Sequence, residues 1–284
     1  MFKQNILAEK TILITGGGSG LGLSMARRFA QLGANIAICG RTQSRLDRAK
    51  KELDQIGKKV FTYSVDVRDY DRLGEMIEKI VAHFGALDSL LNNAAGNFLS
   101  PAEDISPNGF KTIIDIVLQG SFNCTHHFGN YLIRGKKHGS ILNIVTTYAS
   151  LGSAFVLPSA CAKAGVLTMT KSLAAEWAVY GIRVNAIAPG AFPTEGAWSR
   201  LMPDPKMEEM YLKKIPAGRY GEHIELANLA TFLLSDLAPF ITGECVTIDG
   251  GESLQGGQFN FLTQLIPRNL LRQMAKAMRK TQNE

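Results

Sequence analysis

Short apolar runs alternate with longer amphipathic stretches along most of the chain, and this alternation restricts the possible folds more than any other feature. The apolar runs are typical of strands buried on both faces, and the stretches between them carry apolar residues at helical spacing. Strands that alternate with helices indicate a parallel sheet covered by helices on both faces, because the crossovers are right-handed. The predicted strands lie at 10–15, 35–39, 60–67, 87–91, 140–145, 183–188 and 244–248. The predicted fold is therefore α/β, a doubly wound, parallel seven-stranded sheet in a single domain.

The predicted helices lie at 21–32, 45–56, 70–84, 110–132, 159–180 and 222–235. No linker rich in proline, glycine or serine divides residues 1–252, so we expect one domain there. Residues 189–220 contain several prolines and no clear strand, and a stretch of that length is predicted to be a substrate lid with short helices. Residues 253–284 are predicted to form a C-terminal tail, partly helical. Its basic, amphipathic stretch 265–280 is expected to pack on the domain or on a neighbouring subunit; the alternative is contact with a membrane surface or a polyanion.

Composition excludes several classes of protein. No apolar run is long enough to span a membrane, so we expect no stable membrane insertion. The four cysteines lie far apart without CxxC spacing, which predicts neither a disulfide nor a metal site. The net charge of +6 favours a polyanionic ligand, but no basic run with interleaved aromatic residues indicates nucleic-acid binding. No signal, transit or peroxisomal address is recognisable, so the cytoplasm of a bacterium is expected, with the mitochondrial matrix as the alternative.

A glycine-rich turn joins the first predicted strand to the first helix and reads TGGGSGLG. Gly16 lets the chain turn sharply, Gly20 lets a pyrophosphate approach the backbone, and Gly22 lets the helix pack on the sheet. Ser19 and Leu21 belong to the same turn, where the N–H groups of a helix N-terminus attract phosphate. The turn predicts a dinucleotide site of the Rossmann type.

The end of the second strand selects the dinucleotide. A carboxylate there would bind the ribose 2′-OH of NAD, but the sequence reads Cys39-Gly40-Arg41-Thr42. Gly40 leaves room for a 2′-phosphate, and Arg41 can form a charge-assisted pair with it. We therefore predict NADP(H), with a solvated role for Arg41 as the alternative.

Three further strand ends complete the predicted cofactor site. Asp66 can accept from the adenine amine, can cap the next helix, or can do both. Asn93 lies in NNAAG, whose small residues let the backbone approach the cofactor. Pro189, Gly190 and Phe192 follow the sixth strand and are expected to flank the nicotinamide.

Residues 8–252 resemble the short-chain dehydrogenases/reductases in the glycine turn, in Asp66-Val67, in NNAAG, in Lys163 and in Pro189-Gly190. The resemblance implies a site of serine, tyrosine and lysine, with the tyrosine four residues before the lysine. Here Ser159 occupies that position, and Thr146 stands where the usual serine would be. A serine hydroxyl cannot replace a phenol as an acid near neutral pH, because it is far less acidic than the tyrosine phenol, whose pKa is ~10.

In this difference from the usual site, the chain resembles one branch of that family, the 2,4-dienoyl-CoA reductases. The shared segments are AAGNFLSP, PSACAKAGV and SLAAEW, together with Tyr148, eleven residues before Ser159. The tyrosine is similar to that of the mitochondrial-type enzymes and their bacterial relatives. The resemblance implies that NADPH reduces a 2,4-dienoyl-CoA to a 3-enoyl-CoA in the β-oxidation of unsaturated fatty acids, with hydride going to C5 and a dienolate forming.

The resemblance also implies catalytic roles. Tyr148 and Asn97 would hold the thioester oxygen, where negative charge develops. Lys163 would bind the nicotinamide ribose and favour a polarised Tyr148 phenol. Ser159 would make room for the acyl chain and hydrogen-bond nearby, or simply pack. For Tyr148 the alternative is an aromatic side chain that lines the cleft.

Four substrate or cofactor positions carry over as Arg68, Phe98, Ser106 and Arg200; for each the alternative is a surface or capping role. An acyl-CoA is the expected partner, and a homotetramer is expected to form through the helices at 110–132 and 159–180. Two other functions remain open: another enoyl- or 3-oxoacyl-thioester reductase, and an NADP-binding protein without catalysis that acts as a sensor or subunit.

Overall fold

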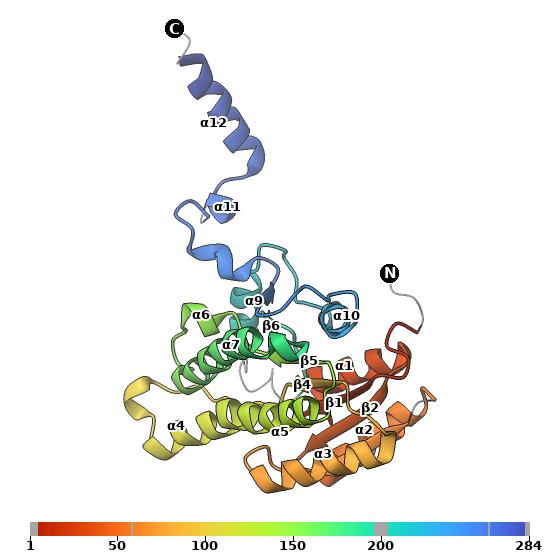
Figure 1. Cartoon of the computed structure of the whole chain (residues 1–284). Helices are drawn as coiled ribbons and strands as arrows, with labels where there is room; N and C mark the ends of the chain where they lie inside the picture. Colours follow the sequence, from red (N-terminus) through yellow and green to blue (C-terminus); the bar gives the residue numbers. More distant parts are fainter. Residues whose placement is uncertain (1–4, 58, 196–203, 261, 282–284) are drawn as a thin grey trace.

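The chain folds around one parallel sheet (Figure 1). The computed structural model describes residues 5–57, 59–195, 204–260 and 262–281. The strand order is β3-β2-β1-β4-β5-β6-β7, which confirms the predicted doubly wound, seven-stranded fold. The strands are β1 (Thr11–Thr15), β2 (Asn35–Gly40), β3 (Val60–Ser64), β4 (Ser89–Asn92), β5 (Gly139–Ile144), β6 (Ile182–Pro189) and β7 (Cys245–Ile248).

Helices cover both faces of the sheet, because successive strand side chains point to opposite sides. Ile12 and Ile14 pack into one apolar core with α1, α2 and α10, whereas Leu13 packs into the other with α3, α5 and α7. The helices from the N-terminus to β7 are α1 (Gly20–Gln31), α2 (Gln43–Asp54), α3 (Tyr70–Phe84), α4 (Pro107–Ile114), α5 (Gly120–Arg134), α6 (Tyr148–Leu151), α7 (Leu157–Trp177), α9 (Pro205–Leu212) and α10 (His223–Leu234).

Two predicted elements differ from the structure. The helix predicted at 110–132 is divided into α4 and α5 by a π-helical turn, Asp115–Gln119. The strand predicted at 60–67 ends at Ser64. The reason is a local turn, in which the Asp66 carboxylate accepts from the backbone N–H of Arg68 at 3.0 Å and bends the chain.

The topological switch point lies between β1 and β4, because the chain crosses from the outer strand β3 to the other side of β1. There the backbone N–H groups of Asn93 and Ala94 both donate to the Thr15 hydroxyl, at 3.0 and 2.9 Å. The glycine turn after β1 is thereby held against the segment after β4. Ligands of open α/β sheets bind at this position.

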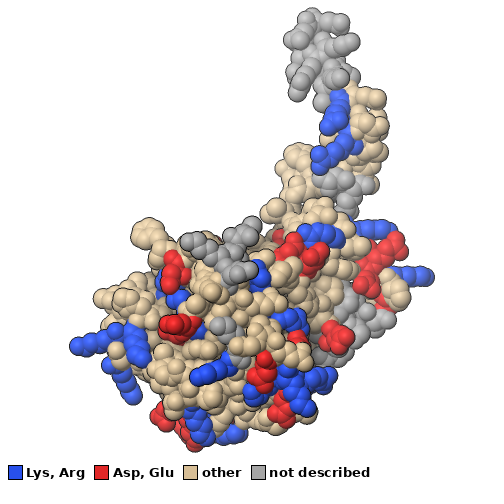
Figure 2. All heavy atoms as spheres, turned by 90° about the vertical axis from the view of Figure 1, so that its right-hand side faces the viewer, with Lys and Arg blue, Asp and Glu red and all other residues tan. Residues whose placement is uncertain are grey.

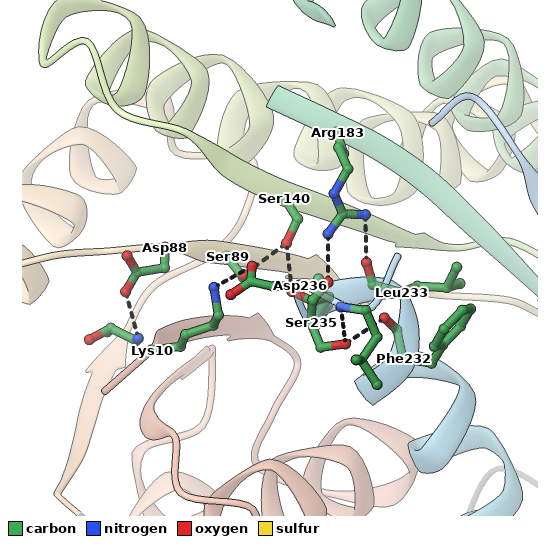
Figure 3. A network of polar contacts seen from close by, with 12 residues as sticks. Lys10, Asp88, Ser89, Ser140, Arg183, Phe232, Leu233, Ser235 and Asp236 are labelled. Atoms are coloured by element: carbon green, nitrogen blue, oxygen red, sulfur yellow. Dashed lines mark hydrogen bonds and ion pairs between the residues drawn. The ribbon is translucent and has the colours of Figure 1, made fainter. Parts of the chain in front are cut away.

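A polar network closes the opposite end of the sheet (Figure 3). Arg183 donates to the carbonyls of Leu233 and Ser235, at 2.8 and 3.1 Å, and so satisfies the last carbonyl groups of α10. Ser89 and Ser140 share a hydrogen bond of 2.9 Å beside it. Burial lowers the pKa of Arg183 from its usual value. This end of the sheet anchors α10 to the strands.

The chain continues after β7 as a 3₁₀ turn (Glu252–Gly256), α11 (Leu262–Leu265) and α12 (Arg268–Thr281). Figure 1 shows α12 extending away from the sheet towards the C-terminus. Figure 2 shows basic side chains on this extension and interspersed charges over the domain. Leu270, Leu271 and Met274 are exposed on α12. Among the described helices, none combines the length and the apolar composition that a membrane crossing requires.

Candidate active site

A cavity of about 1330 Å³ lies at the carboxyl ends of the strands, around the switch point. It is large enough for a dinucleotide together with part of a second ligand, since drug-sized ligands occupy roughly 300–1,000 Å³. Of the residues predicted from the sequence, it is lined by Gly16, Ser19, Leu21, Arg41, Asp66, Asn93, Asn97, Tyr148, Pro189, Gly190 and Phe192.

The glycine turn has the backbone that its sequence predicts. Gly16 and Gly20 have φ of +67° and +54°, a region that disfavours side chains. A Cβ on Gly22 would lie 2.6 Å from the Asn93 amide nitrogen, so the close packing there requires glycine. Ser19 makes no side-chain capping bond to α1. The first N–H groups of α1 therefore point at the turn without a side-chain cap, which suits phosphate binding.

Asn93 has a structural part in this turn. Its side-chain amide donates to the Thr15 carbonyl at 3.0 Å and lies 3.4 Å from the Gly16 carbonyl oxygen. Asn93 thus ties the glycine turn to the segment after β4 while it also lines the cavity.

Positive charge gathers where the 2′-phosphate is expected. Arg41 and Arg45 both line the cavity beside Gly40, and Arg45 comes from the first turn of α2. Sequence reasoning missed Arg45, although its position in the turn after Arg41 was a signal. Two guanidinium groups at this end favour a phosphate there.

Asp66 and Arg68, both predicted to contact ligands, form an ion pair with each other. The Arg68 guanidinium donates to both carboxylate oxygens of Asp66, at 3.0 and 2.7 Å, and this bond lowers the pKa of Asp66. The alternative role of Asp66 as a helix cap is wrong, because Asp69 caps α3 and accepts from the Arg72 N–H. Asp66 lines the cavity, whereas Arg68 is not among the lining residues.

The structure brings Tyr148 and Ser159 together. Tyr148 begins α6, directly after β5, and its hydroxyl lies 3.2 Å from the hydroxyl of Ser159 on α7. Either oxygen could be the donor. Ser159 is buried behind the cavity wall, and Tyr148 faces the cavity. Tyr148 therefore presents the only phenol of this pair of elements, with a hydroxyl partner that can accept or donate.

Lys163 lies one turn of α7 beyond Ser159 and is buried. Its ammonium donates to the Ile144 backbone carbonyl at the end of β5. Burial lowers the pKa of Lys163 to about 8. A lysine so enclosed is unlike a solvated helix lysine, and two N–H donors beyond the bond to Ile144 remain for a ligand or water.

Asn97 and Thr146 supply two more polar groups to the cavity. The Asn97 side-chain oxygen accepts from the Phe98 N–H at 2.9 Å, so its amide nitrogen is the end left to donate. The buried Thr146 hydroxyl has no partner among the described residues. A buried polar group without a partner indicates that water or a ligand meets it.

The remaining predicted substrate positions lie elsewhere. Phe98 packs against an apolar cluster of α4 and α7, and Ser106 caps α4 by accepting from the Gly109 N–H at 3.0 Å. Neither is among the residues that line the cavity. For Ser106 the capping alternative is therefore what the structure shows. Arg200 lies outside the described residues.

The segment predicted as a lid contributes residues that sequence reasoning missed. Helix α9 brings Met207, Met210 and Tyr211 to the cavity, and Glu252 joins them from the turn after β7. The base of the segment is fixed by His223, which bonds the Pro193 carbonyl at 2.7 Å and the Ser24 hydroxyl at 2.8 Å. No local pattern connects α9 to Glu252, so only folding could reveal this wall.

Relatives with curated names match almost the whole chain. The family model described as enoyl-(acyl carrier protein) reductase matches residues 16–253. The probable 2,4-dienoyl-CoA reductase [(2E)-enoyl-CoA-producing] of Bacillus subtilis is 45% identical over 249 residues, 87% of this chain and 98% of the relative. The probable 2,4-dienoyl-CoA reductase 3 [(3E)-enoyl-CoA-producing] of Caenorhabditis elegans is 41% identical over 260 residues, 89% of this chain and 83% of the relative.

Solved structures agree with the fold. A short chain dehydrogenase from Bacillus anthracis has a TM-score of 0.81 at 46% identity, covering 88% of this chain and 98% of that structure. A gluconate 5-dehydrogenase from Burkholderia cenocepacia, in complex with NADP and tartrate, has a TM-score of 0.83 at 32% identity, covering 88% and 98%.

Proposed function

Because this chain belongs to the short-chain dehydrogenase/reductase family and is an oxidoreductase that acts on CH–CH bonds, we propose that it is an NADPH-dependent 2,4-dienoyl-CoA reductase. One observation carries the proposal. Tyr148 presents a phenol to the cavity from α6, and the position four residues before Lys163 is Ser159, against which Tyr148 lies. The tyrosine that is the acid in ordinary carbonyl reduction would lie on α7. Here the proposed donor is Tyr148, which lies on α6 instead.

The residues present fit a nicotinamide dinucleotide, which the family requires. The glycine turn leaves a cradle that side chains would fill, and α1 directs its first N–H groups there. Arg41, which follows β2, and Arg45, in the first turn of α2, favour NADP over NAD, since no carboxylate directly follows that strand. Gly190 and its neighbours would border the nicotinamide. When bound, NADPH supplies the hydride, which we assign to C5 of the dienoyl group.

The cavity's own residues would stabilise the charge that hydride addition creates. Addition at C5 moves negative charge through the conjugated system to the thioester oxygen, forming a dienolate. The Tyr148 hydroxyl and the Asn97 amide nitrogen are the donors assigned to that oxygen. Both are held by local bonds, Tyr148 beside Ser159 and Asn97 through Phe98, so little reorganisation is needed.

Lys163 supports this arrangement through its charge. It lies one turn after Ser159 on α7, and its ammonium donates to the Ile144 carbonyl. A positive charge there favours electron density on the Tyr148 oxygen, and its other N–H groups are assigned to the ribose hydroxyls. Protonation at the α-carbon, by Tyr148 or by water beside it, then yields a 3-enoyl-CoA.

The rest of the substrate has less defined contacts. Arg68, Phe98, Ser106 and Arg200 remain predicted contacts of the thioester arm or the CoA phosphates. In the described structure Arg68 is paired with Asp66, so any phosphate contact would have to share its guanidinium. The exposed Met207 and Met210 on α9 suit the apolar acyl chain.

The assembly and the setting follow from the same proposal. A homotetramer through α5 and α7 would cover Phe122, which is 42% exposed on α5. Light scattering on the purified enzyme tests this assembly. The proposed pathway is the β-oxidation of unsaturated fatty acids, in a bacterial cytoplasm or, alternatively, a mitochondrial matrix.

One assay tests the reaction. NADPH oxidation is measured with 2,4-hexadienoyl-CoA and, in parallel, with acetoacetyl-CoA, and the enoyl product is identified by NMR. The proposal expects turnover of the dienoyl thioester and a double bond at position 3. Turnover of acetoacetyl-CoA alone would show a 3-oxoacyl-thioester reductase instead. Tight NADPH binding without turnover of either thioester would favour a cofactor-binding sensor.

A further inference from the structure

The cavity contains a second tyrosine, on a different wall from Tyr148. Tyr211 lies in the last turn of α9, whereas Tyr148 begins α6 after β5. Both side chains line the same cavity. A reaction that needs one phenolic donor therefore has two phenols within reach of the same space.

Glu252 distinguishes the two tyrosines. The Tyr211 hydroxyl donates to Glu252 Oε1 at 2.7 Å, across 41 residues of sequence. Burial and this bond raise the pKa of Tyr211 well above its usual value. The Tyr148 hydroxyl instead lies 3.2 Å from Ser159, where either oxygen can donate. The proton of Tyr211 is thus committed to a carboxylate, and the proton of Tyr148 is not.

Glu252 also touches the turn that is expected to border the nicotinamide. A Cβ on Gly190 would lie 3.1 Å from Glu252 Oε2 and 2.6 Å from the Cβ of Asp249. Glu252 Oε2 is buried and has no partner among the described residues, so water or a bound ligand is expected to donate to it. The carboxylate therefore joins α9, through Tyr211, to the Pro189-Gly190 turn.

We propose that Glu252 is a positioning residue that holds Tyr211 against the reacting part of the substrate, and that Tyr211 orients the diene without giving it a proton. The bond fixes the last turn of α9, so that the ring of Tyr211 borders the dienoyl group between Tyr148 and the Gly190 turn. This inference rests on the proposed reaction, because it assigns the second phenol of the same cavity.

The test compares hydroxyl and carboxylate variants of the full-length enzyme. Tyr211→Phe keeps the ring and removes the bond, Glu252→Ala removes the acceptor, and Glu252→Gln keeps an acceptor oxygen. Because a misplacement of about 1 Å can cost about 100-fold in rate, we expect kcat to fall about 10- to 100-fold in the first two variants. Glu252→Gln should remain within about threefold of wild type. The double variant Tyr211→Phe/Glu252→Ala should be no slower than either single variant, since both changes break one interaction.

Two readouts separate positioning from simple support of the fold. With NADPH deuterated at the transferred position, Tyr211→Phe should increase the kinetic isotope effect on kcat, because hydride transfer itself becomes slower. Partial unfolding would lower kcat without changing that effect. The shape of the pH–rate profile should stay that of wild type, since Tyr211 supplies no proton.

Tyr220→Phe is the matched control. The Tyr220 hydroxyl donates at 3.1 Å to the Glu208 carbonyl of α9, the helix that carries Tyr211, but Tyr220 is not among the residues that line the active-site cavity. We expect this variant to retain wild-type kcat and isotope effect. An equal loss in Tyr220→Phe, or wild-type kinetics in Tyr211→Phe, would overturn the inference while the wild-type enzyme still reduces 2,4-hexadienoyl-CoA. A wild-type enzyme that reduces no dienoyl thioester would overturn the proposed function first, and this inference with it.

Discussion

Removal of the Tyr148 hydroxyl is the sharpest perturbation of the proposed site. Tyr148→Phe keeps the ring that lines the cavity and deletes only the donor that lies 3.2 Å from Ser159. Loss of one donor to a developing oxyanion typically costs about 10²–10³ in kcat, or about 2.7–4 kcal/mol of transition-state stabilisation. The same hydroxyl contributes about 0.5–1.5 kcal/mol to folding, as one partly buried hydrogen bond. The variant should therefore remain folded while it loses activity.

The assay is NADPH oxidation at saturating 2,4-hexadienoyl-CoA, together with NADPH affinity from the fluorescence of the bound cofactor. We expect kcat to fall about 100- to 1,000-fold with the NADPH dissociation constant changed less than about threefold. Ser159→Ala removes the hydroxyl partner but leaves the Tyr148 donor, so a smaller loss is expected. Tyr220→Phe again serves as a phenol-to-phenyl control that lies off the cavity wall.

A kcat for Tyr148→Phe within about threefold of wild type would refute the oxyanion role, because a lost donor of this kind costs at least about 100-fold. A fall in NADPH affinity as large as the fall in kcat would assign Tyr148 to the cofactor instead. A large loss of kcat with intact affinity, and no loss in the control, is the only result that agrees with the reasoning.

Three further perturbations test other parts of the site. Arg41→Ala should weaken NADPH binding at least about tenfold more than NADH binding, because a charge-assisted phosphate contact is worth about 1.5–3 kcal/mol; equal losses in titrations of the two cofactors would exclude 2′-phosphate recognition. Since burial lowers the pKa of Lys163 to about 8, its ammonium is lost as pH rises through that value, and kcat/KM should decline above about pH 8. Between about pH 8 and 10.5 the Lys163 side chain then binds more protons in the unfolded state than in the folded state. Its contribution to the free energy of unfolding therefore rises across that window, and denaturant titrations of wild type and Lys163→Met can measure the rise. Gly190→Ala would place a Cβ 2.6 Å from the Cβ of Asp249, so thermal denaturation should show a loss of about 1–3 kcal/mol, and NADPH affinity should fall; an unchanged variant would show that the turn can relax.

The alternation of apolar runs and amphipathic stretches was sufficient for the sheet, its parallel direction and its helical layers. These follow from periodicity, which depends on neighbours in the sequence. The glycine turn was equally predictable, because positive φ at Gly16 and Gly20 is a local requirement that only glycine meets easily. The meeting of Tyr148 with Ser159 could be anticipated because both flank one loop between β5 and α7.

Pairing between side chains was harder to anticipate even over short distances. Asp66 has both a cofactor and a capping pattern, yet it pairs with Arg68 while Asp69 caps α3. Ser106 caps α4, and it is not among the residues that line the cavity. Competing partners for one polar group differ by little free energy, so local sequence does not select among them.

Local pattern thus predicted the fold and the glycine turn, because each depends on residues close together in the chain, and the family resemblance identified Ser159 at the position where the tyrosine is usual. The second half of the cavity was decided only by tertiary packing. Tyr211 and Glu252 meet across 41 residues, and the Gly190 turn lies against them although no motif connects the three segments. Such contacts depend on how α9 and the turn after β7 pack against the end of β6, and that arrangement exists only once the whole sheet has formed.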